Sequence, residues 1–119
     1  MKFFLILFFT SIFSISHAQK GIVLVNSATL DNLIALGNKQ ILDVRTSDEF
    51  TSGYIKGAIN IDFWDPAFID QVKKKFDKSL PLIVYCAGGG RSAMAATNLR
   101  KKGFKLIYDL EGGYDSYIE

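Results

Sequence analysis

The sequence predicts an α/β domain with a parallel sheet that is covered by helices on both faces. Short apolar runs alternate with segments of helical periodicity from residue 21 to the end of the chain. This alternation is typical of a sheet whose strands are joined by crossover helices. The run at residues 40–44 is largely apolar, as in parallel strands buried on both sides. No internal repeat or linker divides the 119 residues, so one domain is expected.

Five apolar runs are the expected strands. Each run is short and is bounded by polar or turn-forming residues. Pro81 is acceptable because it is the first residue of its run. The runs are GIVLV (21–25), QILDV (40–44), AINI (58–61), PLIVY (81–85) and KLIYDL (105–110).

Helix start and stop signals lie between these strands. Ser27 is a candidate N-cap for a helix that ends at Leu36, before Gly37. Asp65 followed by Pro66 is a start signal for the helix expected at residues 64–76. The other expected helical segments are a capped turn at 46–53, a helix at 91–103 and a short terminal helix within 112–119.

The first residues have the pattern of an export signal. One lysine precedes an apolar run over residues 3–15, and small Ser16 and Ala18 occupy the positions that a signal peptidase reads. The run is shorter than the roughly 20 apolar residues of a membrane helix. We therefore expect residues 1–18 to be a cleaved signal peptide and residues 19–119 to be a periplasmic or secreted domain without membrane contact. An uncleaved N-terminal anchor is the alternative.

Composition argues against several classes of site. A net charge of +2 gives no electrostatic case for binding nucleic acid. The one histidine, His17, would leave with the signal, so histidine general-base catalysis and histidine metal ligation are not expected. No cluster of soft ligands supports a zinc site, and no cofactor is implied. Cys86 is the only cysteine, so no internal disulfide forms. The domain is expected to be a monomer.

Cys86 is the candidate nucleophile. It follows an expected strand directly and precedes a glycine loop and a helix. Ligands of parallel sheets bind beyond the carboxyl ends of the strands, where this thiol lies. The helix N-terminus, the N–H groups of the glycine loop and the charge of Arg91 all favour a thiolate without a base. The alternative is an inert buried cysteine, with the glycines as a tight turn and Arg91 as a solvent-exposed residue.

Two other loop chemistries fit the residues poorly. A nucleotide-binding P-loop requires a Lys-Ser/Thr pair after its glycines, and that pair is absent. A redox site of the Cys-x-x-Cys type is excluded because a second cysteine is absent. The arrangement of strand, cysteine, glycine loop, arginine and helix therefore indicates an anion-stabilised thiol.

The sequence resembles the rhodanese family of single-domain sulfurtransferases over about residues 22–117. ILDVRTSDEFTSGYIKGAINI (41–61) is similar to the family's signature, which begins Asp-Val-Arg and ends Gly-His-Ile-x-Gly-Ala-x-Asn. IVYCAGGGRSAMAATNLRKKGF (83–104) resembles its active-site loop and helix. IYDLEGGYDSY (107–117) resembles its closing Leu-x-Gly-Gly motif.

The resemblance implies a five-stranded parallel sheet with helices on both faces, and a cysteine that alternates between thiolate and persulfide. Cys86 would take sulfur from a thiosulfate-like donor, release sulfite, and pass the sulfur to cyanide, a thiol or a protein acceptor. Arg91 would neutralise the donor's sulfonate, and Ser92 would either donate a hydrogen bond to the bound group or help to cap the helix. The expected binding loop is Ala87, Gly88, Gly89, Gly90, Arg91 and Ser92.

Two positions depart from the family pattern. Tyr54 stands where the family usually has histidine, and Tyr114 or Tyr117 replaces the aromatic residue after the final glycines. Asp43, Arg45 and Glu49 are expected to have structural roles. Arg45 and Glu49 are close enough in sequence to form an ion pair across the turn after the second strand.

Rival functions stay open on the same scaffold. Related phosphatases use Cys-x5-Arg, whereas four residues separate Cys86 from Arg91 here. The shorter loop makes a smaller cradle, which suits a persulfide better than a phosphoryl group. A small phosphatase or arsenate reductase, a non-catalytic binding module and a sulfur carrier for a dedicated partner are the alternatives.

Overall fold

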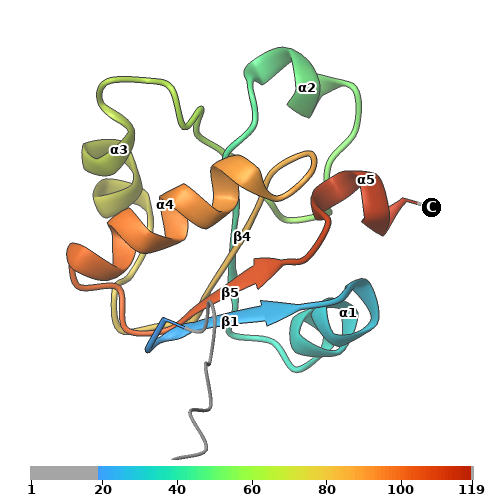
Figure 1. Cartoon of the computed structure of the whole chain (residues 1–119), viewed down its shortest axis with the longest axis horizontal. Coiled ribbons are helices and arrows are strands. Elements are labelled where there is room, and N and C mark those ends of the chain that lie inside the picture. Colours follow the sequence, from blue (N-terminus) through green and yellow to red (C-terminus); the bar gives the residue numbers. More distant parts are fainter. Residues whose placement is uncertain (1–18, 119) are drawn as a thin grey trace, which may run out of the picture.

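Five parallel strands form one sheet in the order β1-β5-β4-β2-β3. Figure 1 shows β5 between β1 and β4. The computed structural model describes residues 19–118, so the expected signal peptide lies outside the described residues and stays a prediction. The strands are β1 (Ile22–Val25), β2 (Gln40–Asp43), β3 (Ile59–Asn60), β4 (Leu82–Tyr85) and β5 (Ile107–Leu110).

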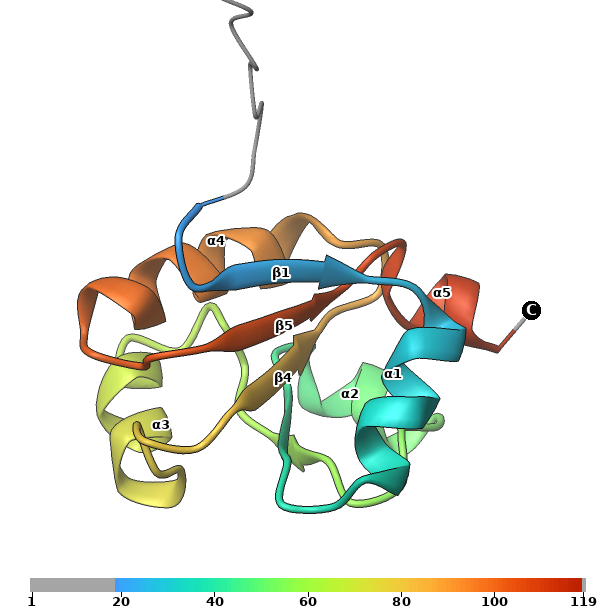
Figure 2. The same cartoon turned by 90° about the horizontal axis from the view of Figure 1, so that it is seen from below.

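Helices cover both faces of this sheet, as the sequence predicts (Figure 2). Helices α3 (Phe68–Lys75) and α4 (Gly90–Lys101) lie on one face, and α1 (Ser27–Ala35) lies on the other. Two shorter helices, α2 (Ser47–Thr51) and α5 (Gly113–Tyr117), follow the carboxyl ends of β2 and β5. Within residues 19–118, no helix has both the length and the apolar character needed to span a bilayer.

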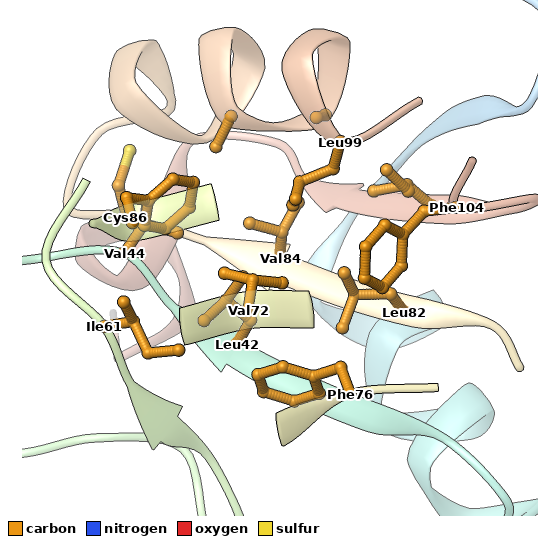
Figure 3. Packing of buried hydrophobic residues seen from close by; sticks show 14 residues of the cluster. Leu42, Val44, Ile61, Val72, Phe76, Leu82, Val84, Cys86, Leu99 and Phe104 are labelled. Atoms are coloured by element: carbon orange, nitrogen blue, oxygen red, sulfur yellow. The ribbon is translucent and has the colours of Figure 1, made fainter. Parts of the chain in front are cut away.

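Buried side chains form two apolar clusters, one on each face. Side chains alternate along a strand, so Leu82 and Val84 of β4 point to one face, whereas Ile83 and Tyr85 point to the other. Cys86 continues the first series and ends the cluster beneath α4 (Figure 3). The pleat of β4 therefore aims the thiol at the helix that follows it.

Helix starts differ from the predictions by one to four residues. Asn26, rather than Ser27, caps α1, and its side-chain oxygen accepts a hydrogen bond from the Thr29 N–H at 2.9 Å. Helix α3 begins at Phe68, because Asp65 accepts the Ala67 N–H at 2.8 Å and closes a turn around Pro66 before the helix starts. A capping residue in the sequence predicts that a helix begins nearby. The first residue of the helix depends on which local hydrogen bonds form.

Candidate active site

Cys86 lies directly after β4, and its sulfur faces the first turn of α4. The side chain is buried, with 1% of its surface exposed. The Gly89 N–H donates a hydrogen bond to Sγ at 3.0 Å, and the Ser92 Oγ lies 3.5 Å from the same sulfur. The sulfur therefore accepts a hydrogen bond from a backbone N–H, a kind of donor that stabilises an anion without a base.

Gly89 requires the conformational freedom of glycine. Its φ of +111° lies in the left-handed region, and in this conformation the residue acts as the N-cap of α4. The N–H groups in the first helical turn, from Gly90 to Ser92, have no acceptors inside the helix. The start of α4 therefore places backbone donors and the positive end of the helix dipole near the sulfur, while ligand binding by residues 87–92 stays a prediction.

Arg91 forms an ion pair with Glu49 of α2. Nη1 donates to Glu49 Oε1 at 2.7 Å, and Nη2 donates to Oε2 at 3.0 Å. The hydrogen bonds from Arg91 lower the pKa of Glu49 to about 2, and the same contact raises the pKa of Arg91. Both terminal nitrogens of Arg91 donate to Glu49 in this conformation, and its expected contact with a donor's sulfonate stays a prediction.

The predicted ion pair between Arg45 and Glu49 is wrong. Arg45 is buried and donates from Nη2 to Asp43 Oδ2 at 2.6 Å, whereas Glu49 binds Arg91. Asp43 stands two residues before Arg45, at the end of β2, and it captures the guanidinium inside the fold. Glu49 lies on α2, and its carboxylate binds Arg91 beside the cysteine loop.

Arg45 contacts two segments next to the cysteine loop, in keeping with its expected structural role. Its Nη2 donates to the Gly53 carbonyl at 2.7 Å, and its guanidinium carbon lies 4.4 Å from the centre of the Tyr114 ring. Tyr114 thus occupies the aromatic position expected after the final glycines. Tyr54, which stands in place of the family's histidine, is half-exposed and stacks on Phe50 at 4.1 Å.

Helix α5 holds the cysteine loop through its backbone. The Tyr114 N–H donates to the Cys86 carbonyl at 2.8 Å, and the Asp115 N–H donates to the Ala87 carbonyl at 3.0 Å. Gly113 permits this approach, because a Cβ there would lie 2.4 Å from the Ala87 oxygen. Sequence reasoning missed this contact, although the Gly-Gly pair was its visible signal.

Ser92 is buried, and its hydroxyl donates to the Gly89 carbonyl at 3.1 Å, which helps to hold the start of α4. Its oxygen also faces the Cys86 sulfur, while a hydrogen bond from Ser92 to a bound group stays a prediction. Among residues 19–118, no group of three or more histidine, cysteine, aspartate or glutamate side chains is placed to hold a metal ion.

Known proteins share this fold and this sequence pattern. The rhodanese-like domain family matches residues 26–119. Thiosulfate sulfurtransferase 16 of Arabidopsis thaliana is 37% identical over 102 residues, covering 78% of this chain and 85% of that protein. Thiosulfate sulfurtransferase 18 of the same plant is 31% identical over 119 residues, covering 89% and 87%.

Solved structures agree with these matches. A rhodanese-like domain protein from Staphylococcus aureus is 30% identical, with a TM-score of 0.70, and the match covers 80% of this chain and 90% of that one. The chain spans about half the length of two longer curated relatives, 52% and 48%.

Proposed function

Because this chain belongs to the rhodanese family, we propose that it is a sulfurtransferase that carries sulfur on Cys86. The donor is a thiosulfate-like anion, and the acceptor is a thiophile such as cyanide, a small thiol or a protein thiol. The observation that carries the proposal is the Gly89 N–H on the Cys86 sulfur, at the N-terminus of α4. The relatives named as thiosulfate sulfurtransferases support the same substrate class.

The first step of the proposed reaction loads the cysteine. The Cys86 thiolate attacks the outer sulfur of thiosulfate, and a new S–S bond forms. The bond between the two sulfur atoms of the donor breaks, and sulfite leaves with its electron pair. Cys86 then carries a persulfide anion, so the negative charge that entered as thiolate is retained next to the loop.

The second step of the proposed reaction transfers the sulfur from Cys86 to the acceptor. Cyanide or a thiolate attacks the outer sulfur of the persulfide, the Cys86 S–S bond breaks, and the thiolate returns. With cyanide the product is thiocyanate. Both resting forms of the enzyme carry an anionic sulfur near the Gly89 N–H, so one set of donors serves the whole cycle.

Arg91 has a different proposed role from the one that the sequence suggests. The Arg91 guanidinium is bound to Glu49. In this conformation Arg91 brings positive charge to the cysteine loop and links α2 to that loop, without binding the donor. The donor's sulfonate would then be received by the free N–H groups of the first turn of α4.

Intact-mass measurement after incubation with thiosulfate tests the proposal. A gain of one sulfur atom is expected, and it must lie on Cys86 because the chain has no other cysteine. Addition of cyanide should remove the sulfur and produce thiocyanate, and Cys86→Ser should show neither step. No adduct on folded protein would refute the proposal. Turnover of a phosphate ester or of arsenate without a sulfur adduct would favour the rival enzymes.

We also propose that the domain is exported, with cleavage after Ala18. The support is the charge and apolar pattern of residues 1–18 alone. The same intact-mass spectrum, taken on protein expressed from the full sequence and recovered from the periplasm, should give the mass of residues 19–119. Full-length protein kept in the membrane fraction would instead indicate an anchor.

A further inference from the structure

Lysines gather at the edge of the sheet where the strands begin. All strands of a parallel sheet start at one edge, and the helices that join them end there. Figure 2 shows β1, β4 and β5 starting on the side where α4 ends. The basic edge is defined by the lysines in these helix ends and in the loops that lead into the strands: Lys20, Lys39, Lys73, Lys74, Lys75, Lys78, Lys101, Lys102 and Lys105.

Hydrogen bonds hold several of these loops together. The Lys105 N–H donates to the Lys78 carbonyl at 3.2 Å. Arg100 donates from Nε to the Lys20 carbonyl at 2.9 Å and from Nη1 to the Lys105 carbonyl at 3.0 Å. The loops that lead into β1, β4 and β5 therefore lie side by side, which brings their lysines onto one surface together with Arg100.

Two exposed leucines stand among these lysines. Leu36 is 75% exposed at the C-terminus of α1, and Leu80 is 41% exposed in the loop before β4. The Gln40 side-chain nitrogen donates to the Asp77 carbonyl at 2.8 Å, so the two loops that carry the leucines are neighbours. Exposed apolar side chains bordered by lysines are typical of surfaces that lie at a lipid–water interface.

Carboxylates do not neutralise the basic edge. Among residues 19–118, both ion pairs use arginines, Arg45 and Arg91, and neither pair includes a lysine. Asp77 is the one carboxylate that these residues place in the loops of the basic edge. Other carboxylates follow the carboxyl ends of the strands, at the opposite edge: Asp48, Glu49, Asp62, Asp65, Glu111 and Asp115. The net charge of +2 sums the two edges and therefore hides their separation.

We propose that the basic edge docks the domain on a membrane surface that contains anionic lipids. The lysine ammonium groups meet the headgroup phosphates, and Leu36 and Leu80 reach the apolar boundary beneath them. Lysine supplies compact charges without the planar fork that selects one carboxylate or phosphate, which suits a field of equivalent headgroups. The domain then contacts a membrane, in contrast to the expectation from the sequence.

The chain also enters the domain at this edge. Gln19 and Lys20 directly precede β1, so cleavage after Ala18 would leave the α-ammonium group of Gln19 at the basic edge. Cys86 follows the last residue of β4, at the opposite edge. A docked domain therefore keeps the cysteine loop away from the membrane, and docking does not depend on the proposed sulfur chemistry.

Co-sedimentation with lipid vesicles tests the inference. The protein used begins at Gln19, because both apolar clusters of the fold lie within residues 19–118. Vesicles of phosphatidylcholine and phosphatidylglycerol in equal parts should bind the domain, and vesicles of phosphatidylcholine alone should not. Binding should weaken steeply as salt is added, since salt screens the attraction between lysines and headgroups. Equal binding to both kinds of vesicle, or binding to neither, would overturn the inference.

Replacement of lysines locates the binding surface. The double variant Lys102→Gln, Lys105→Gln should bind the anionic vesicles about 25-fold more weakly, at about fivefold for each lysine. Lys56→Gln is the control, because it removes an exposed lysine next to Ile55, whose N–H donates to the Tyr85 hydroxyl at the other end of β4. Lys56→Gln should bind like the wild type. A double variant that also binds like the wild type, with an unchanged circular dichroism spectrum, would refute docking through the basic edge.

Replacement of a leucine separates a lipid surface from other anionic partners. Leu36→Gln should weaken binding to the anionic vesicles about tenfold, because a leucine no longer enters the apolar boundary. Duplex DNA or polyglutamate that binds more tightly than the vesicles, with no effect of Leu36→Gln on vesicle binding, would overturn lipid docking in favour of a nucleic acid or an acidic protein. Wild-type protein that takes up sulfur without binding vesicles refutes docking alone. Vesicle binding without sulfur uptake on Cys86 supports docking and refutes the proposed function.

Discussion

Gly113→Ala should release the cysteine loop from helix α5. The φ of Gly113 is +62°, and an alanine held in this left-handed conformation costs about 1–2 kcal/mol. The new Cβ would also lie 2.4 Å from the Ala87 oxygen and 2.5 Å from the Cys86 oxygen, so the backbone must move. Loss of the two hydrogen bonds from Tyr114 and Asp115 adds about 0.5–1.5 kcal/mol each.

The sum is about 2–5 kcal/mol, a large part of the roughly 5–15 kcal/mol that stabilises a domain of this kind. Gly37→Ala is the matched control, because Gly37 has a similar φ of +76° and no atom within 4 Å of its would-be Cβ. It should cost only the conformational term of about 1–2 kcal/mol. The difference between the two variants isolates the close approach of α5 to the loop.

Urea unfolding, monitored by circular dichroism, measures the loss of unfolding free energy in both variants. Sulfur uptake on Cys86 is then compared at a urea-free condition where both variants are folded. Gly113→Ala should lose both stability and rate of uptake, whereas Gly37→Ala should lose a little stability alone. Equal unfolding midpoints for the two variants would refute the reasoning, because the contact with the Cys86 and Ala87 carbonyls would then carry no energy.

Two further predictions concern the ion pairs. Glu49→Gln should lower stability by about 1 kcal/mol near neutral pH, a value kept small because the Glu49–Arg91 pair is partly exposed to solvent. Because the pKa of Glu49 falls from 4.5 to about 2 on folding, the difference in melting temperature between wild type and variant should shrink as the pH drops through that interval, and a constant difference would contradict it. Arg45→Lys should cost about 2–4 kcal/mol in urea unfolding, since lysine cannot keep both the paired contact with Asp43 and the position over the Tyr114 ring. Sulfur uptake per folded molecule should be retained, and lost uptake with unchanged melting would show that Arg45 acts in the reaction.

The strands were predictable because each is a short apolar run between turn-forming residues. The structure keeps all five and trims their ends, as at the first strand, where Gly21 lies outside β1. The sequence indicated that each helix exists, but it did not indicate the residue at which each helix begins. Asn26 and Ser27 are both good caps, and only the hydrogen bond from Thr29 decides between them.

Partners that lie far apart in sequence were harder to predict. Arg45 and Glu49 are neighbours along the chain, yet Glu49 pairs with Arg91, 42 residues away. A nearby opposite charge is a weak guide when a buried carboxylate, here Asp43, stands closer to the arginine in space. The burial of Asp109 gave no signal in the sequence, because it depends on how β5 packs in the folded domain.

The strand order has a consequence for how this domain is made. Strand β1 is bonded to β5 alone, and β5 is the last strand in the chain. A nascent chain therefore carries its first strand unpaired until almost the whole domain has been synthesised. Val23 and Leu24, which remain exposed on this edge strand, stay open to wrong pairing throughout that time. The same last stretch completes the sheet and holds the loop around Cys86, so a chain that is cut short before β5 loses both the partner of β1 and the backbone contacts of that loop.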